Sequence, residues 1–477
     1  MSFSSISFLI FMVAVFILYW ILPHKFRWVA LLAANVIFYA SYEARFLLLI
    51  LLVTLVSYFG AILMEKYPAH KKLFMIIPIV VTVGFLVFYK YTGFILDSVN
   101  KITALLAIPN KPSTLKLIQP LGISFFSFQI IGYMVDVYRG KQQALKHLGK
   151  YAVFVSFFPN ISSGPIERAP HFMPQLEEEK KFDYDTAVYS LTLLLIGLIK
   201  KIIIADSISK YADAVFNNVA GANGWSFILG AILFSLQIYC DFSGYSDMAV
   251  GVAGLLGFKL FENFKQPYFA SSIKGFWAGW HISLSTWLKD YIYIPLGGNR
   301  CSKARRNFNL MVTFLVSGLW HGANWTYILW GGIHGLAQVI ENTINEKFGS
   351  KSDSSESSFR EFMKHLITLT VVCLAWVFFR ANSVSDAFYA ITHLFSGGSF
   401  ADTLSFMGMS TMSVIKILVM TAALTVYDFY GRKTDVIKKF RELKLPIRWI
   451  VYIASAVVVI AVKVHNGADA SFIYFKF

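Results

Sequence analysis

Ser317-Gly-Leu-Trp-His-Gly-Ala-Asn-Trp-Thr326 is the stretch that decides how this chain is interpreted. It lies within residues 307–340, which contain no Asp, Glu, Lys or Arg and are long enough to enter and cross a bilayer. His321 is therefore expected at or near membrane depth. Ionisable side chains are costly there, and they usually line a cavity and serve a function. The stretch predicts a membrane protein with a candidate catalytic histidine.

The composition extends this prediction to the whole chain. Of its 477 residues, 56% are hydrophobic and only 15% are charged, whereas a soluble domain carries about 25% charged residues. Because a spanning helix needs about 20 mainly apolar residues, the uncharged runs predict roughly ten to thirteen membrane segments, some broken or re-entrant. We expect one all-α polytopic membrane domain, with scaffold helices in 1–115, a catalytic core in 116–345 and C-terminal helices in 346–477.

The net charge of +16 is interpreted as membrane topology rather than as a surface for nucleic acid. Clusters of Lys and Arg, such as 300–306 and 432–448, are expected in the cytoplasm. Residues 1–22 carry no charge and precede the basic Lys25 and Arg27, so we expect a retained first helix with an extracytoplasmic N-terminus. A last span near 449–464 then leaves the aromatic tail 466–477 outside as well.

Several polar segments depart from a simple spanning pattern. A helix is predicted over 120–140. Residues 157–170 contain three prolines and cannot form a regular helix, so a re-entrant or interfacial loop is expected there. The aromatic segment 274–300 is expected to lie obliquely or to re-enter the membrane. The three cysteines are far apart and show no metal-ligand spacing, so neither a disulfide framework nor a metal site is predicted.

A neutral histidine in a water-poor cavity can accept a proton from a hydroxyl group. His321 is the first candidate for this role, and Asn324, three residues on, is expected to share its helical face. His281 is the second candidate, although only the fold could bring the two histidines together. The expected lining of the site also includes Trp320, Ser285 and Asp290.

A basic loop lies between the two histidines in the sequence. Its cationic residues would form a cytoplasmic mouth suited to an acidic donor, such as a nucleotide-bearing thioester or an acidic carrier protein. These residues are Arg300, Lys303, Arg305 and Arg306.

Each of these interpretations has a structural alternative. A lone histidine within a membrane can instead form a helix–helix hydrogen bond, and we expect His334 to serve packing alone. Asp241 and Asp247 suggest a proton or cation site, but packing against Arg or Tyr is favoured. The glycines of 251–257 resemble a nucleotide-binding fingerprint only weakly, because no soluble strand precedes them. Tyr474 is either part of an interfacial aromatic anchor or a phenolic nucleophile.

The motifs in 120–140, 157–170, 237–258, 274–300 and 317–335 resemble the membrane-bound O-acyltransferase (MBOAT) family. They are most similar to its bacterial cell-envelope branch, which acetylates alginate or peptidoglycan. The resemblance implies a ring of helices around a thin centre, where a cytoplasmic funnel meets a shorter outer cavity. It implies that His321 is the central catalytic residue and His281 the second active-site position.

The resemblance also implies a division of labour in a bacterial cytoplasmic membrane. No permanently bound cofactor is expected, and acetyl-CoA or an acyl-carrier thioester serves as the donor. The acetyl group passes to an extracytoplasmic SGNH-type partner, which esterifies an exported polysaccharide. The related D-alanyl transfer system uses a small partner peptide with a proposed acyl-carrying tyrosine, and its aromatic motif is similar to the tail around Tyr474. The resemblance therefore implies Tyr474 as an acyl relay.

Two kinds of alternative function stay open at this point. Within the same class, the chain could transfer D-alanyl groups or acylate a lipid. From another class, it could be a transporter or flippase of a polymer precursor, with Asp136, Asp241 and Asp247 as proton sites.

Overall fold

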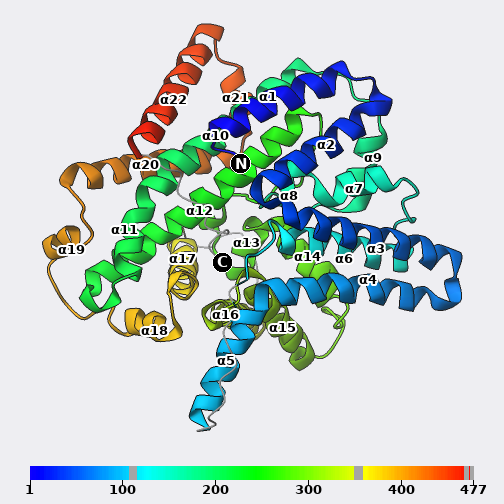
Figure 1. Cartoon of the computed structure of the whole chain (residues 1–477). Coiled ribbons are helices and arrows are strands. Elements are labelled where there is room, and N and C mark those ends of the chain that lie inside the picture. Colours follow the sequence, from blue (N-terminus) through cyan, green and yellow to red (C-terminus); the bar gives the residue numbers. More distant parts are fainter. Residues whose placement is uncertain (107–114, 116, 349–357, 467–471, 473–477) are drawn as a thin grey trace. The chain divides into compact units, whose positions relative to one another are not determined.

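The computed structural model of this chain describes every residue except 107–114, 116, 349–357, 467–471 and 473–477 (Figure 1). The described residues form helices joined by turns and loops. The one pairing of extended residues among them is an isolated bridge between Phe264 and Trp280. The predicted all-α class is confirmed.

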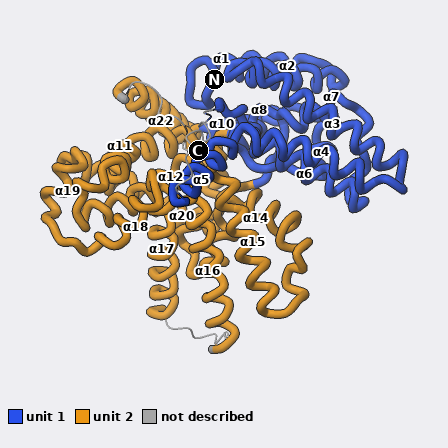
Figure 2. The backbone as a smooth tube through the Cα atoms, turned by 60° about the horizontal axis from the view of Figure 1, so that its bottom comes forward, with its two compact units in different colours: residues 1–194, 249–261 blue, residues 195–248, 262–477 orange. Residues whose placement is uncertain are grey.

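The chain forms two compact units, shown in different colours in Figure 2. Unit 1 contains Met1–Leu194 and Ala249–Phe261, and unit 2 contains Leu195–Met248 and Glu262–Phe477. The predicted division into scaffold, catalytic core and C-terminal helices stays a prediction.

Unit 1 holds the N-terminal helices. They are α1 (Ile6–Ile21), α2 (His24–Glu43), η1 (Ala44–Phe46), α3 (Leu47–Lys66), η2 (Pro68–His70), α4 (Lys71–Leu86), η3 (Val87–Tyr91), α5 (Thr92–Leu105), α6 (Ile123–Tyr138), α7 (Leu148–Ser156), α8 (Phe158–Ile161), α9 (Ala169–Glu177) and most of α10 (Tyr184–Leu198). The helix predicted over 120–140 is confirmed as α6.

Unit 2 holds the remaining helices. They are η4 (Ile199–Ala205), α11 (Asp206–Phe216), η5 (Val219–Gly221), most of α12 (Gly224–Leu255), η6 (Pro267–Phe269), α13 (Ile273–Gly279), α14 (Ile282–Leu288), η7 (Lys289–Tyr293), α15 (Lys303–His321), α16 (Trp325–Phe348), α17 (Ser358–Arg380), α18 (Val384–Thr392), α19 (Phe400–Phe406), α20 (Thr411–Gly431), α21 (Val436–Arg441) and α22 (Leu445–Asn466).

Among the described residues, seven helical stretches are long and apolar enough to cross a membrane. They are His24–Lys66, Pro68–Leu105, Tyr184–Phe216, Gly224–Leu255, Ser358–Arg380, Thr411–Gly431 and Leu445–His465. Two shorter apolar helices, α1 and α6, accompany them. The chain is therefore a multi-pass membrane protein.

The uncharged segment 307–340 does not form one continuous helix. Helix α15 ends at His321 because Gly322 adopts an extended backbone, with φ at −164° and ψ at 154°. Helix α16 begins at Trp325, and the Asn324 side chain accepts a hydrogen bond from the Thr326 N–H at 3.1 Å. Asn324 thus acts as a helix N-cap. The expectation that Asn324 shares a helical face with His321 is wrong, because the helix has already ended.

Helices α15 and α16 then pack closely against each other as a hairpin. Gly318 faces the Tyr327 carbonyl and Gly331 faces the Phe314 carbonyl, and a Cβ atom at either position would overlap these backbone atoms. Small residues allow such a close approach of membrane helices. The hairpin places His321 at the turn between its two helices.

Candidate active site

The structure brings the two predicted histidines together within unit 2. The centroids of the His281 and His321 rings are 6.2 Å apart. Both side chains are buried, with 0% and 2% of their surface exposed. At this separation, both rings can reach one reacting group placed between them, which is the arrangement that general acid–base chemistry needs.

His281 is held in an unusual backbone conformation. It lies between α13 and α14 with φ at 43°, in the left-handed region that residues other than glycine rarely adopt. Such a conformation costs about 1–3 kcal/mol and is often found at functional sites. The aromatic segment 274–300 is thus interrupted at the candidate histidine, and its oblique or re-entrant path through the membrane stays a prediction.

A short extended segment holds the backbone around His281. The Lys265 N–H donates to the Gly279 carbonyl at 2.9 Å, and the Ile282 N–H donates to the Asn263 carbonyl at 3.0 Å. The Ser283 hydroxyl donates to Oδ1 of the buried Asn263 side chain at 2.6 Å. Asn263 therefore fixes both residues that follow His281, and nothing in the local sequence marks it for this role.

We predict that Asn263→Ala lowers the rate of catalysis without unfolding the protein. The loss of the side-chain acceptor lets His281 shift, and small displacements of a catalytic group cost about ten- to a hundredfold in rate. The measurement is kcat and KM for Asn263→Ala made in the wild-type protein and in the His281→Ala variant. Since Asn263 acts through His281, the substitution should lower kcat in wild type and change little in His281→Ala. An equal loss in both backgrounds would contradict this positioning role.

Aromatic rings form the walls around the two histidines. Trp320, predicted from its motif, lies with its ring centroid 5.6 Å from His281 and 5.0 Å from His321. Trp330 and Phe379 lie 5.0 and 5.5 Å from His321. Phe242 lies 4.7 Å from His281. These walls exclude water and strengthen electrostatic interactions with any charge that develops at the site.

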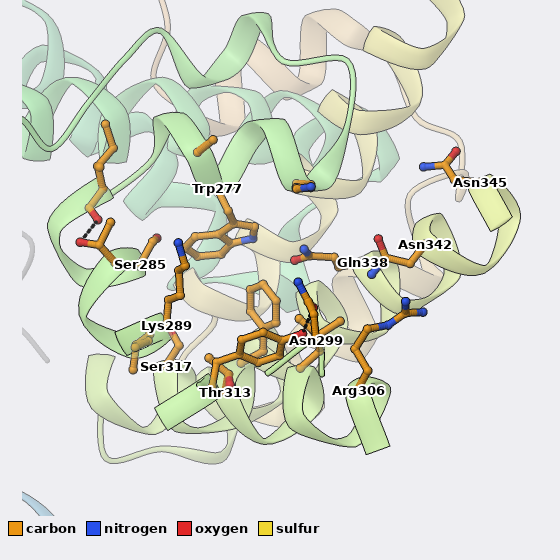
Figure 3. A pocket seen from close by; sticks show the side chains of 18 of the residues that line it. Trp277, Ser285, Lys289, Asn299, Arg306, Thr313, Ser317, Gln338, Asn342 and Asn345 are labelled. Atoms are coloured by element: carbon orange, nitrogen blue, oxygen red, sulfur yellow. Dashed lines mark hydrogen bonds between the residues drawn. The ribbon is translucent and has the colours of Figure 1, made fainter. Parts of the chain in front are cut away.

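A cavity of about 970 Å³ lies among α13, α14, η7, α15 and α16 (Figure 3). On α15, its lining follows one face through Arg306, Leu310, Thr313 and Ser317. Ser317 stands one helical turn before His321, and its buried hydroxyl has no hydrogen-bond partner within the described part of the chain. The remaining polar lining includes Lys274, Ser285, Lys289, Asn299, Gln338, Asn342, Asn345 and Glu346.

The cavity has two different ends. In Figure 3, Ser285, Lys289 and Ser317 lie on one side, while Arg306, Asn342 and Asn345 lie on the other. The Ser317 end is the one nearest to His321 along α15. The arrangement suits an elongated polar ligand with a reactive group at one end and an anionic group at the other.

The basic residues predicted for the mouth have different positions. Arg306 lines the cavity, whereas Arg300, Lys303 and Arg305 are not among its lining residues. Lys303 forms an ion pair with Glu346 at 3.1 Å. Arg305 lies over the Phe308 ring and donates to the Leu296 carbonyl at 3.4 Å. Of the other predicted lining residues, Ser285 faces the cavity and Asp290 lies in η7 outside its lining.

His334 has the packing position that was predicted. Its Nδ1 accepts a hydrogen bond from the Trp277 indole at 3.3 Å, and its ring stacks on Phe276 with an interplanar angle of 5°. The side chain is fully buried.

The intramembrane aspartates of α12 form ion pairs with lysines. Asp241 pairs with Lys201 at 2.7 Å, and Asp247 pairs with Lys200 at 2.8 Å. Both lysines belong to the π-helical segment η4. The expected partners, Arg or Tyr, are therefore wrong, but pairing of this kind is how buried charges are stabilised within membrane proteins, so a structural role accounts for these aspartates.

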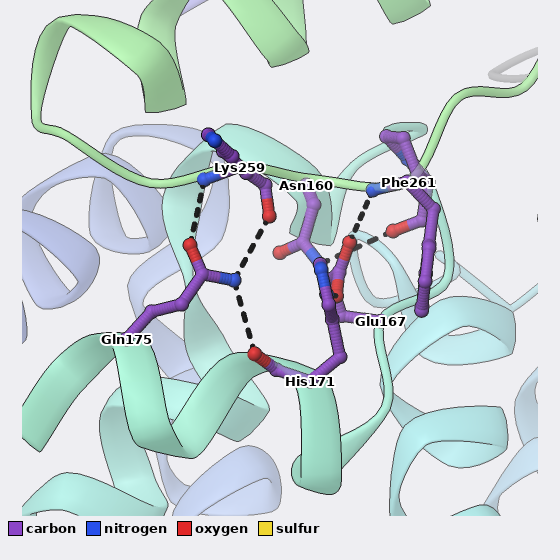
Figure 4. A network of polar contacts seen from close by, with 7 residues as sticks. Asn160, Glu167, His171, Gln175, Lys259 and Phe261 are labelled. Atoms are coloured by element: carbon purple, nitrogen blue, oxygen red, sulfur yellow. Dashed lines mark hydrogen bonds and ion pairs between the residues drawn. The ribbon is translucent and has the colours of Figure 1, made fainter.

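The proline-broken segment 157–170 is irregular, as predicted, and it carries a polar network within unit 1 (Figure 4). The buried Glu167 carboxylate accepts hydrogen bonds from the Phe261 N–H and from His171, both at 2.7 Å. Gln175 exchanges two hydrogen bonds with the Lys259 backbone, at 2.8 and 3.0 Å. These contacts fasten α9 to residues 259–261, which follow α12, and a structural role accounts for them.

After the end of α22 at Asn466, the structure describes one residue of the tail, Phe472. Phe472 is buried, with its ring centroid 4.4 Å from Tyr245 and 6.1 Å from Phe242. Phe242 in turn contacts His281. Tyr474 lies outside the described residues. Within the described part of the chain, no group of three His, Cys, Asp or Glu side chains is arranged to hold a metal ion.

Comparison with known proteins gives a consistent set of matches. The model of the MBOAT, membrane-bound O-acyltransferase family matches residues 145–385. The chain is 37% identical to the probable alginate O-acetylase AlgI of Pseudomonas aeruginosa over 440 residues, which cover 90% of this chain and 81% of the relative. It is 35% identical to the peptidoglycan O-acetyltransferase of Helicobacter pylori, over 75% of this chain and 71% of that protein. It is 31% identical to the teichoic acid D-alanyltransferase of Bacillus subtilis, over 56% of this chain and 70% of that protein.

Proposed function

Because the chain belongs to the membrane-bound O-acyltransferase family and is an O-acyltransferase, we propose that it moves an acetyl group from cytosolic acetyl-CoA through the membrane, for O-acetylation of an exported polysaccharide. The observation that supports this most is the pair of buried histidines, of which His321 lies one helical turn beyond Ser317 at one end of a polar cavity. The names of the relatives favour alginate, peptidoglycan or a similar polymer as the acceptor.

In the proposed reaction, neutral His321 takes the proton of an acceptor hydroxyl as its oxygen attacks the thioester carbonyl carbon. A C–O bond forms, the C–S bond breaks, and the thiolate leaves with the proton that the imidazolium returns. His281 orients the reacting groups or stabilises the oxyanion that develops on the carbonyl oxygen. The aromatic walls keep water from hydrolysing the thioester.

The cavity chemistry supports a nucleotide thioester as the donor. Side-chain amides along α16, at Gln338, Asn342 and Asn345, offer donors and acceptors that match the amides of a pantetheine arm. Arg306 supplies positive charge for an anionic group. The similarity to a D-alanyltransferase keeps a carrier-protein thioester as the second candidate donor. Competition between acetyl-CoA and a D-alanyl carrier thioester in one assay separates the two.

The acceptor is proposed to arrive from the extracytoplasmic side of a bacterial cytoplasmic membrane, where both termini are expected. Phe472 contacts Phe242, the wall residue beside His281. Tyr474 follows Phe472 by two residues in the sequence and is the proposed acyl relay, because Phe472 contacts this wall. A serine of an SGNH-type partner would then take the acetyl group and esterify the polysaccharide.

We predict that protein purified after incubation with isotopically labelled acetyl-CoA carries the label on Tyr474. Mass spectrometry of tail peptides makes the measurement. The label should be absent in Tyr474→Phe and in His321→Gln. It should persist in the control Tyr430→Phe, which removes the hydroxyl of an exposed tyrosine that has no proposed role. Turnover of acetyl-CoA without covalent label would contradict the relay but not the acetyltransferase function.

A further inference from the structure

An acidic residue, Glu346, pairs with the basic side chains at the Arg306 end of the cavity. The Glu346 carboxylate pairs with Arg306 at 2.5 Å and with Lys303 at 3.1 Å. Arg306 and Glu346 both line the cavity. The three residues come from the start of α15 and the end of α16, so hairpin packing brings them together.

The Arg306 side chain offers more hydrogen-bonding capacity than Glu346 uses. Its Nε is buried and has no hydrogen-bond partner within the described part of the chain. The hydrogen bonds from Arg306 and Lys303 hold the pKa of Glu346 below its usual range, so this carboxylate is charged at neutral pH. The exposed part of the guanidinium is the part that Glu346 contacts, so a second, more highly charged anion would bind there by replacing this carboxylate.

We propose that Arg306 and Lys303 form a phosphate subsite for the nucleotide end of the donor, and that Glu346 is an internal competitor which the phosphate displaces. The inference rests on the proposed function. The lining of α15 runs from Arg306 to Ser317 and leads to His321, which is about 22 Å further along the helix axis than Arg306. An elongated thioester with phosphates at one end and its acyl group at the other matches this layout. Glu346 therefore lowers the affinity for phosphorylated donors and leaves the affinity for unphosphorylated ones unchanged.

The test is the binding of CoA and of pantetheine, which lacks the phosphates, to the detergent-purified full chain. Because a partly exposed ion pair near the protein surface contributes little to stability, Glu346→Gln should fold normally. We expect it to lower the Kd for CoA by roughly two- to fivefold and to leave the Kd for pantetheine unchanged. Arg306→Gln should weaken CoA binding, and the gain from Glu346→Gln should disappear in the double variant.

A matched control is Glu442→Gln, which removes an equivalent charge from the exposed pair with Lys439, at 2.9 Å. This variant should change neither Kd. If it strengthens CoA binding as much as Glu346→Gln does, the effect comes from the net charge of the protein and the inference is overturned. A Kd for CoA that stays constant or rises in Glu346→Gln would also overturn it. If neither wild type nor Glu346→Gln binds CoA, the phosphate subsite is wrong, whereas acetyl transfer from another thioester would preserve the acyltransferase function.

Discussion

His321→Gln is expected to lower acyl transfer by about 10²- to 10⁴-fold, which is the usual contribution of a positioned general base. Glutamine keeps much of the volume of histidine and its hydrogen-bonding ability, but it cannot take the proton of the acceptor hydroxyl. The side chain is enclosed by Trp320, Trp330 and Phe379, so no bulk water can replace it as the base. The measurement is the release of CoA from acetyl-CoA by the purified protein, together with the O-acetyl content of the cell-envelope polysaccharide.

His334→Gln is the control matched for burial. His334 is buried in the same unit and contacts Trp330, but it accepts a structural hydrogen bond from Trp277. We expect this variant to lose stability and to retain activity within about tenfold of wild type, because it takes no part in the proton transfer. If His321→Gln is folded and keeps more than a tenth of the wild-type activity, a different group must be the base.

Gly331→Ala is expected to destabilise the hairpin that presents His321 and to abolish activity with it. The added Cβ would overlap the Phe314 carbonyl oxygen, which belongs to the backbone of α15 and cannot rotate away. Overpacking of this kind costs about 1–3 kcal/mol or more. The forced separation of the helices also moves the neighbouring Trp330, which contacts the His321 ring at 5.0 Å. The melting temperature should fall, and acetyl-CoA turnover should be lost.

The adjacent Gly332→Ala provides the comparison. Its Cβ would meet Leu315 Cδ2 at 3.6 Å, which is an ordinary van der Waals contact. Because alanine also has the higher helix propensity, this variant should be as stable as wild type or slightly more stable, by about 1 kcal/mol at most. Equal melting temperatures for the two variants would contradict the close hairpin packing at Gly331.

The sequence predicted the two histidines of the candidate site, but it did not predict every residue that surrounds them. The motif around His321 and the aromatic segment around His281 marked both histidines, because each stands in an unusual local context. The predicted position of Asn324 on the helical face of His321 is wrong, because the uncharged sequence shows no change at Gly322, where the helix ends. The wall residues Phe242 and Phe379 gave no signal, because aromatic residues are common throughout this chain.

The sequence by itself determined the all-α membrane class, the family resemblance and the two histidines. These depend on local composition and on short motifs, which can be recognised in the linear sequence. Only the tertiary structure decided that the histidine rings lie 6.2 Å apart, that Asn263 holds the strained backbone near His281, and that Glu346 covers Arg306. Each of these contacts joins residues 20 or more positions apart in the sequence. Such residues meet only when helices and the segments between them pack together, and no local sequence pattern encodes that geometry.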